Sequence, residues 1–149
     1  MKIDLPLKAY IPVGWVGQEA LRLELYRFIA TAGDHGRLEE VRAEAVDRYG
    51  RLPQEVETLL AVASLRVTCL ELGVQEIATY RDQVRVKPLA LADADALALA
   101  ERVPGATFHA ATSTLNLSPA GERGAELARW IEGALRAAAG AREPASVTG

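Results

Sequence analysis

Hydrophobic positions in the first half of the chain recur at the spacing of an α-helix. From Gln18 onward, apolar residues fall at every third or fourth position, which predicts an amphipathic helix of about four turns. A second apolar stripe predicts a helix over residues 37–49, and Gly50 then supplies a left-handed C-cap that a Cβ would resist. Pro53 suits the first turn of a third helix, which runs to Gly73. The pattern therefore predicts three consecutive helices.

After the third helix the apolar period shortens. The runs VQEIATY and VRVKP, separated by RDQ, are typical of a β-hairpin. A helical pattern follows in ALADADALALAERVPG, then a second pair of short strands in ATFHAATSTLNLSP, and a final helix in GERGAELARWIEGALRAAAG. Helices segregated from antiparallel strand pairs indicate an α+β fold. We therefore predict three N-terminal helices, then hairpin, helix, hairpin and helix, with a small antiparallel sheet packed on the helices.

The two ends of the chain lack this periodicity. Pro6 and Pro12 bias residues 1–16 toward an extended N-terminal arm, and the apolar side chains of the arm favour packing across the domain. No apolar stripe continues over residues 141–149, which are expected to form a flexible tail. We therefore expect a single domain over residues 1–140.

Composition agrees with a globular domain. The 149 residues suffice for one ordinary domain, and 50% of them are hydrophobic while 25% are charged. No apolar run approaches the roughly 20 residues that cross a bilayer, and the N-terminus lacks a secretory signal, so we expect a cytoplasmic protein. The formal net charge of −3 argues against a chain that wraps nucleic acid electrostatically.

Residue types that carry chemistry are sparse. The phosphate-binding loop GxxxxGK[ST] does not occur in the sequence, so we expect no nucleotide hydrolysis by this chain. His35 and His109 have no partners at metal-ligand spacing, and Cys69 is the only cysteine, so no metal site, disulfide or cofactor is expected. Ser64 and Cys69 lie on the apolar third helix without a recognisable base, which favours a core serine and a core thiol.

The last turn of the second predicted helix carries a cluster of charge. Glu44, Asp47 and Arg48 have the spacing i, i+3, i+4, so their side chains project together from that turn. Acidic groups at a helix C-terminus oppose the macrodipole, by roughly a few tenths of a kcal/mol each. The cluster is either an ordinary solvated face or an acidic patch, braced by Arg48, that meets a basic patch on a partner. Periodicity alone leaves both interpretations open.

Several segments carry a resemblance to a known family. LPLKAYIP, RLELYRFIA, LEEVRAEAVDRYGRLPQEVETLL and RVTCLELGVQEI resemble the C-terminal domain of the bacterial transcription-repair coupling factor, Mfd, over about Ile3 to Ile77. Beyond Ile77 the resemblance lies in element order. It implies a piece of a much larger protein that carries an N-terminal module similar to UvrB, an RNA-polymerase-binding domain and an ATP-driven DNA translocase motor.

The resemblance also implies a regulatory role without catalysis or a cofactor. In this family the C-terminal domain packs on the UvrB-like module of the same protein and covers the surface that binds UvrA. The family's contact face matches Glu44, Asp47 and Arg48 here. UvrA and RNA polymerase are then indirect partners through the full-length chain, and neither a membrane nor direct nucleic-acid binding is expected. The alternative is an accessory DNA-contacting domain that assists the motor through four arginines, namely Arg22, Arg27, Arg37 and Arg51.

Overall fold

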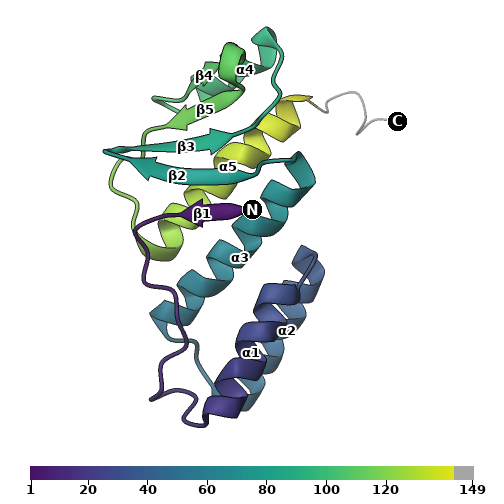
Figure 1. Ribbon diagram of the computed structural model, residues 1–149, viewed down its shortest axis with the longest axis vertical. Helices are drawn as coiled ribbons and strands as arrows, with labels where there is room; N and C mark the ends of the chain where they lie inside the picture. The colour runs from purple at the N-terminus through teal and green to yellow at the C-terminus, as the bar shows by residue number, and fades with distance from the viewer. Residues whose placement is uncertain (143–149) are drawn as a thin grey trace. The chain divides into compact units, whose positions relative to one another are not determined.

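The computed structural model describes residues 1–142 of the chain as five α-helices, five β-strands and a 3-10 turn (Figure 1). In chain order the elements are β1 (Lys2–Asp4), α1 (Glu19–Thr31), α2 (His35–Tyr49), α3 (Gln54–Leu72), β2 (Glu76–Tyr80), β3 (Gln83–Lys87), α4 (Asp93–Arg102), β4 (Thr107–His109), η1 (Ala110–Thr112), β5 (Thr114–Leu117) and α5 (Gly124–Arg142). The predicted tail falls mostly outside the described residues, which end at 142; the two tail residues that are described, 141 and 142, belong to α5.

The chain divides into two compact units. Within residues 1–142, the helical unit comprises residues 7–67 and 123–129, and the sheet unit comprises residues 1–6, 68–122 and 130–142. The two 19-residue helices, α3 and α5, each contribute residues to both units. Among the described residues, no helix has both the length and the apolar composition needed to cross a membrane.

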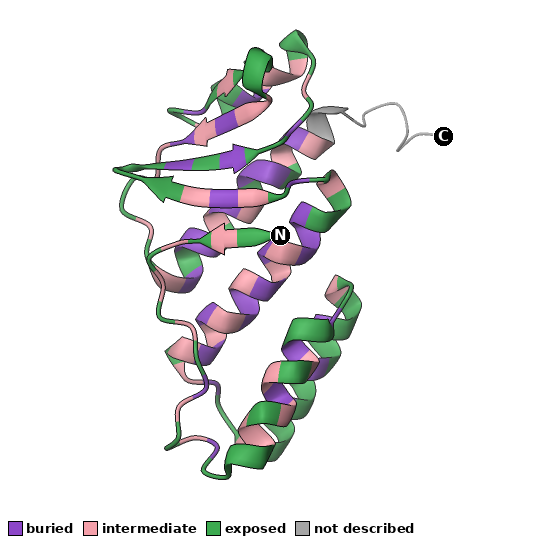
Figure 2. Ribbon diagram, viewed as in Figure 1, coloured by how far each residue is buried: buried purple, intermediate pink, exposed green. Residues whose placement is uncertain are grey.

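The helical unit is built on the apolar stripes of α1, α2 and the first part of α3, which appear as buried bands in Figure 2. The predicted N-terminal arm joins this core rather than extending into solvent: the backbone N–H of Ile11 donates to the Tyr26 hydroxyl at 2.7 Å. The Trp15 ring packs edge-on against Tyr49, with the ring centroids 5.4 Å apart. The buried residues of this core are Ile11, Val16, Leu25, Ile29, Ala32, Leu38, Val41, Ala45, Leu52, Val56, Leu60, Ala63 and Val67.

Local signals at both ends of α2 explain its length. The helix begins two residues before the predicted start, because the Asp34 carboxylate caps it by accepting a hydrogen bond from the backbone N–H of Arg37 at 2.7 Å. It ends at Gly50, as predicted, where the backbone N–H donates to the Val46 carbonyl at 2.8 Å. The Gly50 conformation differs from the expected αL cap: φ 86° with ψ −160° belongs to a region that is open essentially only to glycine.

The sheet unit confirms the α+β class and corrects one strand. Both predicted hairpins form, and they join through β3 and β5 into one sheet with the order β1-β2-β3-β5-β4. The neighbouring pairs among β2, β3, β5 and β4 are antiparallel, but β1 pairs in parallel with β2, so the sheet is mixed rather than purely antiparallel. Residues 2–4, which were predicted as part of the extended N-terminal arm, therefore supply an edge strand.

The buried face of the sheet follows the expected alternation of side chains. Ile77, Val84, Val86, Leu115 and Leu117 are all buried along β2, β3 and β5. The sheet unit also buries the apolar stripe of α5, which includes Ile131 and Leu135, and the single thiol, Cys69. Burial raises the pKa of the Cys69 thiol to about 12, so this group stays protonated as the predicted core thiol.

Candidate docking surfaces

The predicted charge cluster lies exposed on the last turn of α2, and the structure gives it a member from another helix. Arg48 Nη1 lies 3.9 Å from Glu44 Oε1, the pairing expected from their i, i+4 spacing, and 3.8 Å from Glu24 Oε1 on α1. The Arg48 guanidinium also lies over the ring of Tyr49, with its central carbon 5.5 Å from the ring centroid. Arg48 is thus held between two carboxylates and an aromatic face.

Asp47 differs from the other two predicted residues. It is exposed, and among residues 1–142 no ion pair involves its carboxylate. The structure therefore brings Glu44 and Arg48 together with Glu24, while Asp47 stands beside them on the solvent side of α2. Sequence reasoning missed Glu24 because it lies on a different helix, 24 positions from Arg48, where no periodicity connects the two.

The charges at this surface border a groove with an apolar floor. The groove runs between α1 and α2, so side chains from both helices line it. We call this face the clamp surface and define it by Glu24, Glu44, Asp47 and Arg48. The residues that line the groove are Leu21, Glu24, Leu25, Phe28, Val41, Glu44, Ala45, Arg48 and Tyr49.

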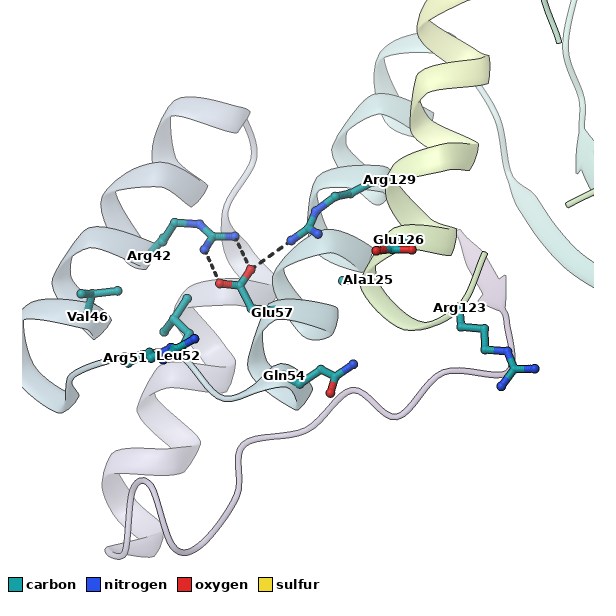
Figure 3. Close-up of a pocket in the computed structure, with 10 residues that line it drawn as sticks. All are labelled: Arg42, Val46, Arg51, Leu52, Gln54, Glu57, Arg123, Ala125, Glu126 and Arg129. Carbon is teal, nitrogen blue, oxygen red and sulfur yellow. Dashed lines mark hydrogen bonds and ion pairs between the residues drawn. The ribbon is translucent and has the colours of Figure 1, made fainter. Parts of the chain in front are cut away.

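A second, larger hollow opens on the other flank of α2. This cleft has a volume of about 1000 Å³. Figure 3 shows the residues that line it, which come from α2, the loop before α3, α3, the residue before α5 and the first turns of α5. We call it the arginine cleft, because four of its lining residues are arginines. The lining residues are Arg42, Val46, Arg51, Leu52, Gln54, Glu57, Arg123, Ala125, Glu126 and Arg129.

A hydrogen-bonded ion network crosses the arginine cleft. The Arg42 guanidinium donates to both carboxylate oxygens of Glu57, at 2.9 and 3.1 Å, and Arg129 Nη2 donates to Glu57 Oε2 at 3.0 Å (Figure 3). Because both partners are ionised, these hydrogen bonds are stronger than those between neutral groups, and the fork geometry of Arg42 adds specificity. The hydrogen bonds from Arg42 hold the pKa of Glu57 below its ordinary value of 4.5, and the same contact raises the pKa of Arg42.

The network gives a pH-dependent contribution to stability. Because the pKa of Glu57 is lower in the folded chain, its stabilisation is complete above the unfolded value of about 4.5 and is lost as the pH falls toward the folded value. We expect Glu57→Gln to lower the free energy of unfolding at pH 7 by about 1–2 kcal/mol and to flatten its decline in acid. Urea unfolding at pH 7 and at about pH 3 measures both effects. Glu126→Gln, a change at an exposed carboxylate of the same cleft, serves as the control. An equal loss at both pH values would contradict the assignment.

The structure gives the four arginines of the alternative DNA hypothesis different surroundings. Arg22 Nη1 donates to the carbonyls of Val16 and Gly17, at 3.0 and 2.9 Å, and so anchors the N-terminal arm. Arg37 forms an ion pair of 2.9 Å with Glu40 and lies over the Phe28 ring. Arg51 lines the arginine cleft, whereas Arg27 is an exposed residue of α1.

The structure also places one of the two histidines beside a serine. His35, the first residue of α2, has its Nδ1 atom 3.2 Å from Ser64 Oγ in the middle of α3. The two side chains are half-buried, so Ser64 is not the fully buried core serine that was predicted, and its hydrogen bond with His35 ties α2 to α3. Within the described range, no group of three or more His, Cys, Asp or Glu side chains could hold a metal ion.

These features define an α+β fold whose helical unit carries two charged surfaces, the clamp surface and the arginine cleft. Residues 5–97 match the family model described as the TRCF domain, and the chain belongs to this family. The transcription-repair-coupling factor of Mycobacterium tuberculosis (strain CDC 1551 / Oshkosh) is 37% identical over 135 residues, which cover 89% of this chain and 11% of that protein. The factor of Escherichia coli (strain K12) is 33% identical over 76 residues, which cover 51% of this chain and 7% of that protein.

A solved structure shows the same fold. The crystal structure of a C-terminal domain of transcription-repair coupling factor matches with a TM-score of 0.81, covering 96% of this chain and 94% of that one, at 16% sequence identity. The resemblance seen in the sequence is thereby confirmed, and it extends beyond the first half of the chain. The chain spans about a tenth of the length of the curated relatives in the preceding comparison, since it covers 11% and 7% of them.

Proposed function

We propose that this chain is a non-catalytic regulatory domain of a transcription-repair coupling factor. In this proposal the domain packs on the UvrB-like N-terminal module of the same protein and masks the surface that binds UvrA. Membership of the TRCF domain family and the fold shared with a C-terminal domain of such a factor support the placement. The clamp surface supplies the contact.

The geometry at Arg48 is the observation that favours a docking role. Its two carboxylate partners lie at 3.8 and 3.9 Å, longer than a charge-assisted hydrogen bond, and the Arg48 side chain keeps 45% of its exposure. The guanidinium therefore has donors to spare, and the neighbouring carboxylates have open lone pairs. A partner with a basic patch and one carboxylate can satisfy all of these groups without breaking a strong internal bond.

The energetics suit a contact that opens on a signal. Exposed ion pairs contribute about 0–1 kcal/mol each, and pairs that lose water on docking contribute more. A few such pairs above a small apolar groove give an interdomain contact of modest strength. An autoinhibitory contact must be of this kind, because binding of another ligand can shift the equilibrium only by its own difference in affinity between the closed and open states.

The proposal is tested by a pull-down of the 149-residue chain against the separate UvrB-like module at two salt concentrations. We expect capture at about 0.05 M salt and loss of capture at about 1 M, where the Debye length falls to about 3 Å. A parallel sample with Glu19→Lys and Glu39→Lys, two exposed changes outside the clamp surface, is expected to behave like the unchanged chain. Failure to bind at low salt would rule out the electrostatic clamp.

A further inference from the structure

The arginine cleft lies on a different face of α2 from the clamp surface. At about 100° per residue, Arg42 and Val46 point roughly opposite to Glu44 and Arg48 around the helix axis. The two groups of residues line different hollows, and the two hollows have no lining residue in common. A partner in the cleft would therefore use a surface that the proposed clamp leaves open.

Two arginines of the cleft are available to a ligand. Arg42 and Arg129 are engaged with Glu57, whereas Arg51 and Arg123 are exposed and form no ion pair within residues 1–142. In the view of Figure 3, Arg51 and Arg123 lie on either side of the Glu57 network. Four arginines against two carboxylates, Glu57 and Glu126, make the cleft positive on a chain with a formal net charge of −3.

Backbone groups reinforce this positive character. The helices α3 and α5 begin at Gln54 and Gly124, and residues of both first turns line the cleft. The free N–H groups of a helix's first turn carry partial positive charge and favour an anionic group nearby. Arginine side chains and helix N-termini thus point to the same ligand chemistry, a carboxylate or a phosphate.

We propose that the arginine cleft docks an acidic protein segment. Carboxylates of the segment pair with the guanidinium groups of Arg51 and Arg123, and an aliphatic side chain between the carboxylates covers Val46, which is 43% exposed at the edge of the cleft. The Arg42–Glu57–Arg129 network holds the cleft wall in place and leaves those two arginines to the partner.

Two observations favour a protein partner over a nucleic acid. The lining contains no aromatic ring on which a base could stack, a contact that single-strand binding uses throughout. The carboxylates of Glu57 and Glu126 would repel a continuous phosphate backbone, whereas a peptide can place an apolar or polar side chain opposite them. The apolar contribution of Val46 and Ala125 also matches a side chain rather than a phosphodiester.

The test is fluorescence anisotropy of the 149-residue chain with labelled probes. The probes are a peptide of Glu, Asp and Leu residues, the same peptide with Lys in place of each acid, and single-stranded and duplex DNA of similar length. We expect the acidic peptide to bind most tightly and the Lys peptide not to bind. The double variant Arg51→Glu with Arg123→Glu should lower the affinity for the acidic peptide at least tenfold.

A matched variant separates the cleft from general charge. Arg27→Glu with Arg102→Glu makes the same change in net charge at two exposed positions outside the cleft. The affinity of this variant for the acidic peptide should stay within twofold of that of the unchanged chain. Circular dichroism checks the fold of each variant, and Arg51→Gln with Arg123→Gln replaces the reversal if that variant unfolds. Tighter binding of DNA than of the acidic peptide, equal loss in both double variants, or no binding of the acidic peptide would each overturn the proposal.

Discussion

Reversing two charges on α2, with Glu44→Lys and Asp47→Lys, is expected to raise the affinity of the full-length protein for UvrA by about 30-fold or more. Each carboxylate that pairs with a basic partner contributes on the order of 1 kcal/mol, and a lysine in its place removes that contribution. Two such changes therefore weaken the closed state by about 2 kcal/mol or more, and every 1.4 kcal/mol is a factor of ten. Titration of UvrA against the unchanged and the variant protein measures the difference.

Two controls isolate the clamp in that experiment. Glu19→Lys with Glu39→Lys changes the net charge equally at exposed positions outside the clamp surface and should leave UvrA binding unchanged. High salt should raise the UvrA affinity of the unchanged protein toward that of the variant, because screening weakens the same charge pairs. If the double reversal at Glu44 and Asp47 left UvrA binding as it was, the assignment of this face would be wrong.

The clamp surface shows which part of a site a single sequence can supply. The contact between Glu44 and Arg48 follows from helical periodicity, because side chains at i and i+4 are neighbours on any α-helix. The contact of Arg48 with Glu24 requires α1 and α2 to pack at a particular rotation, which depends on how the apolar stripes interlock. No local pattern encodes that rotation, so only the structure shows that Glu24 belongs to the charge cluster.

The sequence did not predict the arginine cleft, again because its residues meet only through the packing of elements that are distant along the chain. Its network joins Arg42, Glu57 and Arg129, which are separated by 15 and 72 positions along the chain. An arginine or glutamate on a helix is usually solvated, so the sequence carries no signal that these three would converge. Only the packing of three elements within the helical unit turns them into a lined hollow.

The fold was predictable wherever the signal is local. Helix stripes, the Gly50 stop and the short turn between β2 and β3 are properties of adjacent residues, and all were predicted near their observed positions. β1 was not predicted, because its three residues are too few to show alternation, and it pairs with β2 across 74 positions of the chain. The predicted start of α2 lies two residues after the observed one, because the prediction does not include the N-cap at Asp34.

Ile77→Ala is expected to lower the free energy of unfolding by about 3 kcal/mol. Ile77 is fully buried in β2, opposite Ile3 on one neighbouring strand and Val86 on the other. Removing its side-chain carbons beyond Cβ leaves a cavity in a close-packed interior, and changes of this type cost about 2–5 kcal/mol. Urea unfolding followed by circular dichroism gives the difference, and Ile77→Val, which costs about 0.5–1.5 kcal/mol, is the graded control.

The same variant separates stability from docking. Ile77 belongs to the sheet unit, whereas Glu44, Asp47 and Arg48 lie on the helical unit, whose core consists of other residues. Under conditions where Ile77→Ala remains folded, capture by the UvrB-like module should therefore match that of the unchanged chain, while Glu44→Lys with Asp47→Lys should lose capture without a comparable loss of stability. A loss of capture that tracked the free energy of unfolding across both variants would instead mean that the charges act through folding, and the clamp would have to be assigned to another face.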